Sequence, residues 1–487
     1  MKNQIQLIAY ADRFGKKGIA AIQDFLESKL SDVFGGIHIL PFYYPIDGAD
    51  AGYDPIDHTS TDSKIGEWTD VKNLSGLLEI TADLIVNHIS GDSKEFKDVL
   101  KNGSQSPYFD LFITREKVFG ERPSLEDIKK IYRPRPTSPF TEKKLNTGET
   151  FNFWTTFTSN QLDIDVIHEK GQKYLDNILN IFSANGIKMI RLDAAGYAIK
   201  KAGTSCFMLP ETYDFIDAIT QQAHDKGIKV LVEIHGHHSL QLDLSKRVDY
   251  VYDFALPPLV LHTLYTQSSD AIKKWLSISP RNVVTVLDTH DGIGIVDVAK
   301  EGDKEGILDG VAINQLVENI HAFSNNTSRM ATGAAASNLD LYQVNCTYYD
   351  ALGQDDELYY MARAIQFFSP GIPQVYYAGF LAAENDMGLL EKTQVGRDIN
   401  RPYFSFNQIG EHINKPVVTK LIELMKFRNS HPSFSGIFNL QESAETSLSI
   451  KWTNDSYWSQ LNIDLVNKQV EITFGDGQKN ETNLRWD

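Results

Sequence analysis

Charged side chains follow several apolar runs of this chain, at the points where buried strands would end. In KMIRLDAAGYAIKK (188–201), Arg191 and Asp193 stand two residues apart after an apolar stretch. Alternation along a strand puts residues i and i+2 on one face, so these two side chains point the same way. A structural ion pair would explain this stretch taken alone. Other apolar runs end similarly, in Asn87 and His88, in Glu233 and His235, and in His290 and Asp291.

Three carboxylates at such positions are suited to cleaving a glycosidic bond. Retaining glycosidases use one ionised carboxylate as nucleophile and one protonated carboxyl group as general acid, about 5 Å apart. We expect Arg191 to hold the pKa of Asp193 down and keep it anionic. Glu233 lies in the apolar run VLVEI, where burial would raise its pKa and let it donate a proton. Asp291 would then stabilise the positive charge that develops on the sugar.

The apolar runs alternate with amphipathic helical segments, which predicts how these side chains come together. Segments 171–186 and 211–227 have apolar residues at helical spacing and end in glycine. Eight such runs favour an α/β fold of the parallel (β/α)8 type, a TIM barrel, over a doubly wound sheet. Active sites of these barrels lie at the C-terminal ends of the strands. The eight runs are 5–11, 37–42, 81–88, 187–194, 228–235, 248–256, 283–290 and 372–379.

Two long segments lack this alternation of strands and helices, and they predict insertions at the rim of the barrel. Residues 87–166 are expected to form an inserted subdomain after the third strand, and residues 292–353 a second insertion between strands seven and eight. The barrel would then comprise residues 1–86, 167–291 and 354–433. Period-two alternation in SLSIKWT (447–453) and KQVEITF (468–474) predicts a small C-terminal β domain over residues 434–487.

Composition narrows the class of partner and the compartment. The formal charge is 47 − 64 = −17, and without a long basic tract this argues against nucleic acid or an anionic membrane as a partner. Two cysteines, Cys206 and Cys346, cannot supply a disulfide framework, which suits a reducing compartment. The N-terminal residues lack the apolar core of a signal peptide, and we find no run of about 18 uncharged apolar residues. The sequence therefore predicts a cytoplasmic protein.

Several motifs resemble those of a known family. RLDAAGYA (191–198), VEIH (232–235) and LDTHD (287–291) resemble the catalytic motifs of the α-amylase superfamily, and ADLIVNH (82–88) is similar to its strand-three motif. DGADAGYDPIDH (47–58), YRPRP (132–136), GAAASNLDLYQVN (333–345) and GRDINR (396–401) resemble the sucrose phosphorylase branch more narrowly. The resemblance implies reversible, retaining phosphorolysis of sucrose by inorganic phosphate, giving glucose 1-phosphate and fructose through a covalent glucosyl-enzyme. It also implies a homodimer and no cofactor or metal.

The resemblance assigns a role to each matching residue. Asp193 would be the nucleophile, Glu233 the acid/base and Asp291 the transition-state stabiliser. Tyr53 stands where a phenylalanine is expected, and its hydroxyl is expected to affect how tightly the pocket closes. The residues expected to bind the glucosyl group are Asp50, Tyr53, His88, Phe157, Arg191, His290 and Arg397, and Gln161 is expected to bind substrate.

Phosphate and fructose make opposite demands on the acceptor side. The resemblance implies phosphate contacts from Arg135, Tyr197, His235 and Tyr342, and fructose contacts from Asp340 and Gln343. Leu341 is also expected to bind substrate. Arg135 would attract phosphate and Asp340 would repel it. We therefore hypothesise that the two inserted loops rearrange between the half-reactions, withdrawing Asp340 and bringing in Arg135.

Other functions stay open on the sequence alone. A related phosphorylase of sucrose 6′-phosphate, glucosylglycerol or glucosylglycerate, or a retaining α-glucosidase or transglucosidase, would carry the same carboxylates. A non-catalytic barrel, which would serve only as a binding or scaffold subunit, would have no need of the three carboxylates Asp193, Glu233 and Asp291. EIHGHH (233–238) suggests a zinc site only weakly, because no H-E-x-x-H spacing or cysteine accompanies it, and His237 and His238 are expected to face solvent.

Overall fold

The computed structural model describes residues 1–120, 123–133, 137–332, 343–476 and 482–484. Its centre is a closed barrel of eight parallel strands that neighbour one another in chain order, which confirms the predicted (β/α)8 fold. Each predicted run overlaps one barrel strand. The strands are β1 (Gln6–Ala9), β3 (Gly36–Ile39), β6 (Glu79–Ile85), β11 (Ile187–Asp193), β12 (Lys229–Val232), β13 (Tyr250–Asp253), β14 (Val283–Thr285) and β17 (Ile372–Tyr376).

The register of the barrel strands aligns the residues that carry chemistry. Strand β11 pairs with β6 on one side, where Arg191 is level with Asp83, and with β12 on the other, where Leu192 is level with Val232. Because the strands are parallel, the residues that follow them emerge at the same end of the barrel. Glu233 thus comes out beside Asp193.

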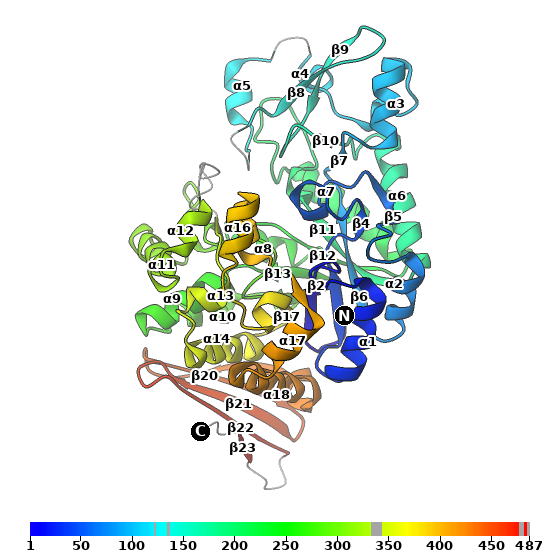
Figure 1. Cartoon of the computed structure of the whole chain (residues 1–487). Helices are drawn as coiled ribbons and strands as arrows, with labels where there is room; N and C mark the ends of the chain where they lie inside the picture. The colour runs from blue at the N-terminus through cyan, green and yellow to red at the C-terminus, as the bar shows by residue number, and fades with distance from the viewer. Residues whose placement is uncertain (121–122, 134–136, 333–342, 477–481, 485–487) are drawn as a thin grey trace.

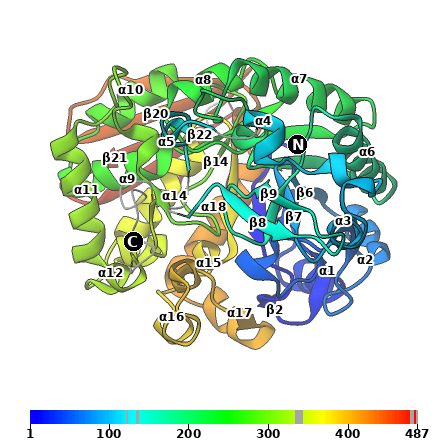
Figure 2. The same ribbon diagram turned by 90° about the horizontal axis from the view of Figure 1, so that it is seen from above.

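Helices surround the strands, as Figure 2 shows from above. Helix α6 buries Leu175, Ile178, Leu179 and Phe182 at helical spacing. The predicted glycine ends are present, since Gly186 after α6 and Gly227 after α7 have φ values of +82° and +72°. The surrounding helices are α1 (Gly18–Lys29), α2 (Trp68–Ser75), α6 (Glu169–Ala184), α7 (Pro210–His224), α8 (Ser239–Leu244), α9 (Leu256–Thr266), α10 (Asp270–Ile278), α11 (Gly310–Phe323), α14 (Asp356–Phe368) and α18 (Pro416–Ser430).

A small subdomain follows β6 and lies at the top of Figure 1. Two antiparallel strand pairs, β7 with β10 and β8 with β9, are packed with short helices around Phe96, Phe112 and Phe153. Its elements are β7 (His88–Ser90), α3 (Lys94–Asn102), α4 (Arg115–Phe119), α5 (Leu125–Lys130), β8 (Phe140–Lys144), β9 (Thr150–Trp154) and β10 (Gln161–Asp163).

A second irregular region separates β14 from β17. Antiparallel pairing of β15 with β16 joins its two ends, with Ile293 opposite Val344. Its elements are β15 (Ile293–Gly294), the 3₁₀ helix η5 (Val296–Val298), α11, α12 (Thr327–Thr332), β16 (Gln343–Val344) and α13 (Tyr348–Ala351). The remaining short elements are β2 (Phe14–Gly15), β4 (Tyr43–Tyr44), β5 (Asp57–Thr61), α15 (Tyr377–Phe380), α16 (Met387–Thr393), β18 (Phe404–Ser405) and α17 (Phe406–Ile413).

The C-terminal part is an antiparallel five-stranded sheet, drawn in red at the bottom of Figure 1. It packs on the barrel through apolar side chains, since the rings of Phe434 and Phe368 lie 5.1 Å apart and Trp452 Nε1 donates to Phe368 O at 2.8 Å. The strands are β19 (Ile437–Gln441), β20 (Ser447–Asn454), β21 (Tyr457–Asp464), β22 (Gln469–Gly475) and β23 (Thr482–Leu484). A small C-terminal β domain is thereby confirmed, while the residue boundaries between domains stay predictions.

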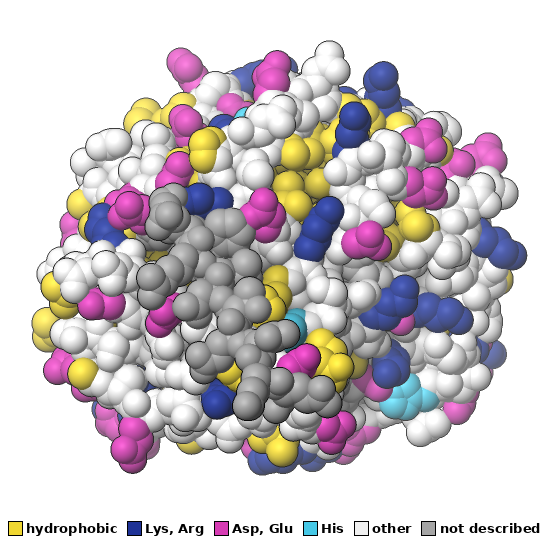
Figure 3. Space-filling view, turned by 90° about the horizontal axis from the view of Figure 1, so that it is seen from below, with side chains coloured by type: hydrophobic (Ala, Val, Ile, Leu, Met, Phe, Trp, Pro, Cys, Tyr) yellow, Lys and Arg dark blue, Asp and Glu magenta, His cyan; other side chains and the backbone are white. Residues whose placement is uncertain are grey.

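The surface and the helices give two further facts. On the face drawn in Figure 3, acidic and basic side chains are interspersed among uncharged ones. Among the described residues, no helix combines the length and the apolar character needed to cross a bilayer.

Candidate active site

Strand β11 presents Arg191 and Asp193 at the centre of a charged cluster. Arg191 Nη1 lies 2.8 Å from Asp193 Oδ1 and 2.5 Å from an oxygen of Asp83, and its Nη2 lies 3.8 Å from Glu233 Oε1. The Arg191 side chain is only 4% exposed, so these charges interact with little screening. One guanidinium therefore contacts both carboxylates that the sequence proposes for catalysis. The distance of about 5 Å between those two carboxylates stays a prediction.

Arg191 acts on Asp193 in the expected direction, but the expectation that the pKa of Asp193 is held down is wrong. Burial raises the pKa of Asp193 to about 8, and the negative charge of Glu233 adds to this rise, while Arg191 acts in the opposite direction. The physical reason is that the effect of burial outweighs the attraction of Arg191, which also pairs with Asp83.

The acid/base candidate Glu233 lies beside an imidazole. Its Oε1 is 3.5 Å from His235 Nε2. The His235 ring stacks on Phe254, with ring centres 3.9 Å apart. Burial lowers the pKa of His235, but the nearby carboxylate of Asp297 raises it further, and the net direction is upward. This site therefore pairs a carboxyl group with a histidine that is readily protonated.

Asp291 is held as an anion by two arginines. Arg397 Nη1 lies 2.8 Å from its Oδ1, and Arg401 Nη2 lies 3.8 Å away. Burial alone would raise the pKa of Asp291, but Arg397, His290 and Arg401 together lower it well below its usual range. A permanently ionised carboxylate is suited to stabilising positive charge on a bound sugar. Asp50 Oδ1 approaches Arg397 Nη1 as well, at 3.7 Å.

Aromatic and imidazole side chains line up beside this cluster. The rings of Tyr53 and His290 stack at 4.8 Å with an interplanar angle of 11°. His88 Nε2 lies 2.9 Å from the backbone oxygen of Tyr53, and Gln161 Nε2 donates to the same oxygen at 3.5 Å. The ring of Phe157 lies 5.2 Å from that of His88. The predicted glucosyl-binding residues are thus brought together.

The Tyr53 hydroxyl belongs to the charged cluster. It accepts a hydrogen bond from Arg191 Nη1 at 3.3 Å and donates to Asp83 Oδ1 at 3.4 Å. The side chain as a whole is 5% exposed. Tyr53 thus helps to hold Arg191 in place, and an effect of its hydroxyl on pocket closure stays a prediction.

The acceptor side is described in part. The ring of Tyr197 lies 5.2 Å from that of Phe157, and Gln343 Nε2 lies 3.3 Å from His235 Nε2. The hypothesis of rearranging loops depends on residues outside the described ones. These are Arg135, Asp340, Leu341 and Tyr342.

Lys200 is a residue of this region that sequence reasoning missed. Its Nζ lies 2.7 Å from Asp163 Oδ2 and donates to Asn87 Oδ1 at 2.9 Å and to Thr156 Oγ1 at 3.2 Å. The side chains of Lys200 and Asp163 are 2% and 0% exposed. This buried ion pair joins the barrel to the subdomain. The only signal in the sequence was the pair of lysines, Lys200 and Lys201, at the end of KMIRLDAAGYAIKK. Nothing in the sequence indicates which of the two is buried.

Three residues of the site have the spacing of a metal-binding group. Among the described residues, ligand atoms of Glu233, His235 and Asp291 all lie within 4.8 Å of one another. Arg191 and Arg397 already place positive charge on the two carboxylates, which would oppose a cation there. This balance of charge disfavours a metal ion at these three residues.

His237, one of the histidines that suggested a zinc site, is buried and not exposed as expected. His237 is 3% exposed and lies with its Nε2 3.0 Å from the backbone oxygen of Glu305, so the prediction that it faces solvent is wrong. The loop folds inward because this carbonyl and the Ser239 hydroxyl satisfy both ring nitrogens.

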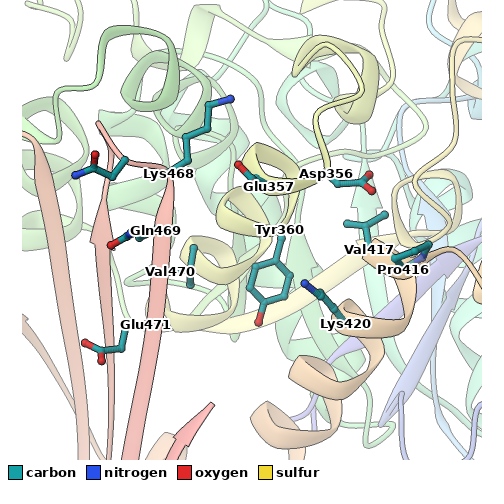
Figure 4. Close-up of a pocket in the computed structure, with 11 residues that line it drawn as sticks. Asp356, Glu357, Tyr360, Pro416, Val417, Lys420, Lys468, Gln469, Val470 and Glu471 are labelled. Carbon is teal, nitrogen blue, oxygen red and sulfur yellow. The ribbon is translucent and has the colours of Figure 1, made fainter. Parts of the chain in front are cut away.

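A separate groove lies between the barrel and the C-terminal sheet (Figure 4). Its volume is about 710 Å³, and it is lined by the starts of α14 and α18 and by residues 467–471. Tyr360 and Lys420 face it from the helices, and Glu471 lies on the sheet side. The lining mixes acidic, basic and apolar groups, and we assign no chemistry to it.

Comparison with known proteins places this site in a family. Residues 18–379 match the family model of the α-amylase catalytic domain. The chain is 51% identical to a sucrose phosphorylase of Agrobacterium vitis over 97% of each chain. It is 48% identical to the sucrose phosphorylase of Bifidobacterium adolescentis, over 95% of this chain and 92% of that one.

A solved structure agrees over the whole fold. The crystal structure of sucrose 6F-phosphate phosphorylase from Thermoanaerobacter thermosaccharolyticum superposes with a TM-score of 0.92 and 38% identity, covering 99% of this chain and 97% of that one. The fold, the converging carboxylates and the full-length similarity agree with one another. The chain therefore belongs to the α-amylase family and, within it, to the sucrose phosphorylase group of enzymes.

Proposed function

We propose that the enzyme catalyses the reversible phosphorolysis of sucrose to α-D-glucose 1-phosphate and D-fructose, with retention at the anomeric carbon. The observation that carries the proposal is the joint contact of Asp193 and Glu233 with Arg191, in a chain about half identical to sucrose phosphorylases. Two carboxyl groups beside one guanidinium have the equipment for a double displacement.

In the first half-reaction, Asp193 attacks C1 of the glucosyl group. A bond forms between C1 and a carboxylate oxygen of Asp193 while the bond from C1 to the fructosyl oxygen breaks. Glu233 gives its proton to that departing oxygen, so fructose leaves as a neutral alcohol. Arg191 stabilises the ionised form of Asp193 that the attack requires, and Asp291 faces the positive charge that builds up on the sugar.

In the second half-reaction, a phosphate oxygen attacks C1. The bond between C1 and Asp193 breaks, and the proton of the attacking phosphate hydroxyl passes to Glu233, which restores the starting protonation state. The two inversions at C1 give net retention. Tyr197, His235 and Gln343 are the described residues to which we assign acceptor contacts, alongside Arg135, Asp340, Leu341 and Tyr342.

The test is an assay of the purified protein on sucrose with and without inorganic phosphate. We expect glucose 1-phosphate and fructose in equal amounts when phosphate is present, with the α anomer identified by NMR. Release of glucose and fructose at one rate, whether or not phosphate is added, would instead identify a hydrolase.

A second candidate is phosphorolysis of sucrose 6′-phosphate, which the close match to a solved phosphorylase of that substrate favours. The two differ only in the acceptor, so the reverse reaction separates them. With glucose 1-phosphate as donor, we expect kcat/KM for fructose to exceed that for fructose 6-phosphate, glycerol and glycerate by at least about tenfold, or ~1.4 kcal/mol. A preference for fructose 6-phosphate would make the second candidate correct.

We also propose a cytoplasmic location and a homodimer. Both cysteines are free and buried, which suits a reducing compartment. Light scattering on the purified enzyme tests the dimer, and a mass equal to a single chain would contradict it.

A further inference from the structure

The Nδ1 atom of His235 contacts a buried carboxylate that has no part in the mechanism proposed above. Asp297, in η5, has no exposed surface, and its Oδ2 lies 3.1 Å from His235 Nδ1. Its other oxygen accepts hydrogen bonds from the backbone of Gly236 at 3.3 Å and from Gln241 Nε2 at 3.5 Å. These three contacts fix the carboxylate and make it an acceptor for the Nδ1 proton.

The opposite edge of the ring faces the acid/base and the acceptor side. His235 Nε2 lies 3.5 Å from Glu233 Oε1 and 3.3 Å from Gln343 Nε2. The Gln343 oxygen accepts from the backbone of Gly292 at 3.3 Å, which turns its amide NH₂ toward His235. A neutral His235 therefore donates from Nδ1 to Asp297 and accepts from Gln343 at Nε2. A protonated His235 donates from Nε2 to Glu233.

We propose that Asp297 is a positioning residue that lets His235 become positively charged when Glu233 is ionised, so that the glucosyl-enzyme selects phosphate over water. The inference rests on the proposed function. Glu233 is ionised only after it has protonated the departing fructose. At that stage the imidazole lies between two carboxylates, and it takes up a proton from solvent.

The balance of charge gives the physical reason. Among the described residues, the carboxylates of Asp297, Glu233 and Asp291 act on His235, and they raise its pKa although burial lowers it. These carboxylates alone would repel an incoming phosphate, and an imidazolium beside Glu233 offsets part of that repulsion. Water is neutral and gains nothing from the added charge. The proton on His235 stays there during transfer, while the phosphate hydroxyl proton goes to Glu233.

The test is the ratio of glucose 1-phosphate to free glucose that the full-length enzyme forms from sucrose at a fixed phosphate concentration. Both products arise from one glucosyl-enzyme, so the ratio does not depend on how much protein is folded. Asp297→Asn is expected to lower the ratio at least about tenfold, the change that ~1.4 kcal/mol of lost charge stabilisation gives, and to raise KM for phosphate. A purely structural role would reduce both products in proportion.

Two further variants make the test specific. Asp253→Asn removes another fully buried carboxylate, which bonds Trp275 Nε1 at 3.0 Å, and should leave the ratio within about twofold. His235→Gln should lower the ratio as Asp297→Asn does, and the double variant should lower it no further. A ratio near wild type in Asp297→Asn, or full additivity in the double variant, overturns the inference.

The pH dependence of the wild-type ratio gives a second measurement, which does not need the Asp297 variant to fold. The ratio should fall as pH rises, because His235 loses its proton. The titration of phosphate itself is common to both proteins, so the fall should be smaller in His235→Gln by the part that His235 contributes. Equal pH profiles would contradict the inference. Wild-type enzyme that forms no glucose 1-phosphate at all would contradict the proposed function instead.

Discussion

Asp83 lies 2.5 Å from Arg191 inside the barrel, and the pair has almost no exposed surface. The two residues are level with each other on adjacent strands β6 and β11. His38 Nε2 contacts the other oxygen of Asp83 at 2.9 Å. Arg191 is therefore anchored by the buried carboxylate of Asp83, which fixes the direction in which it faces Asp193 and Glu233.

Replacement of Asp83 should destabilise the enzyme in a pH-dependent way. Burial alone would raise the pKa of Asp83, but His38 and Arg191 lower it to about 2 from 3.8. A lowered pKa contributes stability that is present above the unfolded value and is lost as pH falls through the folded one. Asp83→Asn should cost about 3–5 kcal/mol at pH 7. About 2 kcal/mol of that difference should disappear between pH 5 and pH 2.

Urea unfolding of both proteins at several pH values measures this. Asp47→Asn is the matched control, because Asp47 pairs with Lys64 while 67% exposed and should matter by less than about 0.5 kcal/mol. An Asp83 variant whose stability deficit is constant with pH would be inconsistent with an ionised Asp83.

Asp193→Asn should abolish turnover and stabilise the fold. The pKa of Asp193 is raised to about 8 by burial and by Glu233, so the folded protein keeps a proton that the unfolded chain loses above pH 4. Stability therefore falls as pH rises from about 4 to about 8. The variant lacks this titration, and its melting temperature should exceed that of wild type by a few degrees at pH 8, with a smaller gain at pH 5. Scanning calorimetry at the two pH values measures both, and a variant less stable at pH 8 would refute the assignment.

Glu233→Gln should separate the two catalytic steps. Without a proton donor, turnover of sucrose should fall about 10³-fold. A donor with a good leaving group, α-D-glucosyl fluoride, should still glucosylate Asp193 at a rate within about tenfold of wild type.

Glu233→Gln should also shift the pH profile of the reaction with α-D-glucosyl fluoride. Loss of the charge at position 233 lowers the pKa of Asp193, so the acid limb of the fluoride reaction should shift to lower pH. Stopped-flow fluoride release measures the limb. An unmoved limb would mean that the two carboxyl groups are not coupled.

Lys200→Met should weaken the attachment of the subdomain to the barrel. It leaves Asp163 buried beside the Thr156 hydroxyl without its cation, at a cost of about 3–5 kcal/mol. Asp163→Asn in the same chain should recover about 2 kcal/mol, as expected for directly coupled residues. Denaturant unfolding of the four proteins gives this coupling energy.

The adjacent lysine provides the control for that cycle. Lys201 is 57% exposed and pairs with Glu211, and its replacement by Met should change stability by less than about 0.5 kcal/mol. Additive effects of the Lys200 and Asp163 replacements would show that the ion pair contributes nothing.

Trp452→Ala should destabilise the contact between sheet and barrel without altering catalysis. The side chain is 6% exposed and donates to the end of α14, so its loss should cost about 3–5 kcal/mol. Trp458, on the neighbouring strand, is partly exposed, and its replacement by Ala should cost less than about 1.5 kcal/mol. Product ratios at 25 °C should equal those of wild type, and a changed ratio would link the sheet to the active site.

The sequence by itself determined the eight barrel strands, because buried parallel strands are apolar along their whole length and their pattern is local. It also indicated which carboxylates to propose for chemistry, since each stands at or soon after the C-terminal end of a barrel strand and all strands end on one rim. The motifs then identified Asp193, Glu233 and Asp291 as the residues to test. These inferences need no knowledge of which side chains touch.

Only the tertiary structure decided how the charges are shared. The sequence pairs Arg191 with Asp193 because they are two residues apart, but Asp83 and Glu233 come from other strands and compete for the same guanidinium. Lys200 with Asp163 and His235 with Asp297 are likewise contacts between distant segments. A pKa depends on burial and on every charge within a few ångströms, and both quantities exist only once the chain has folded.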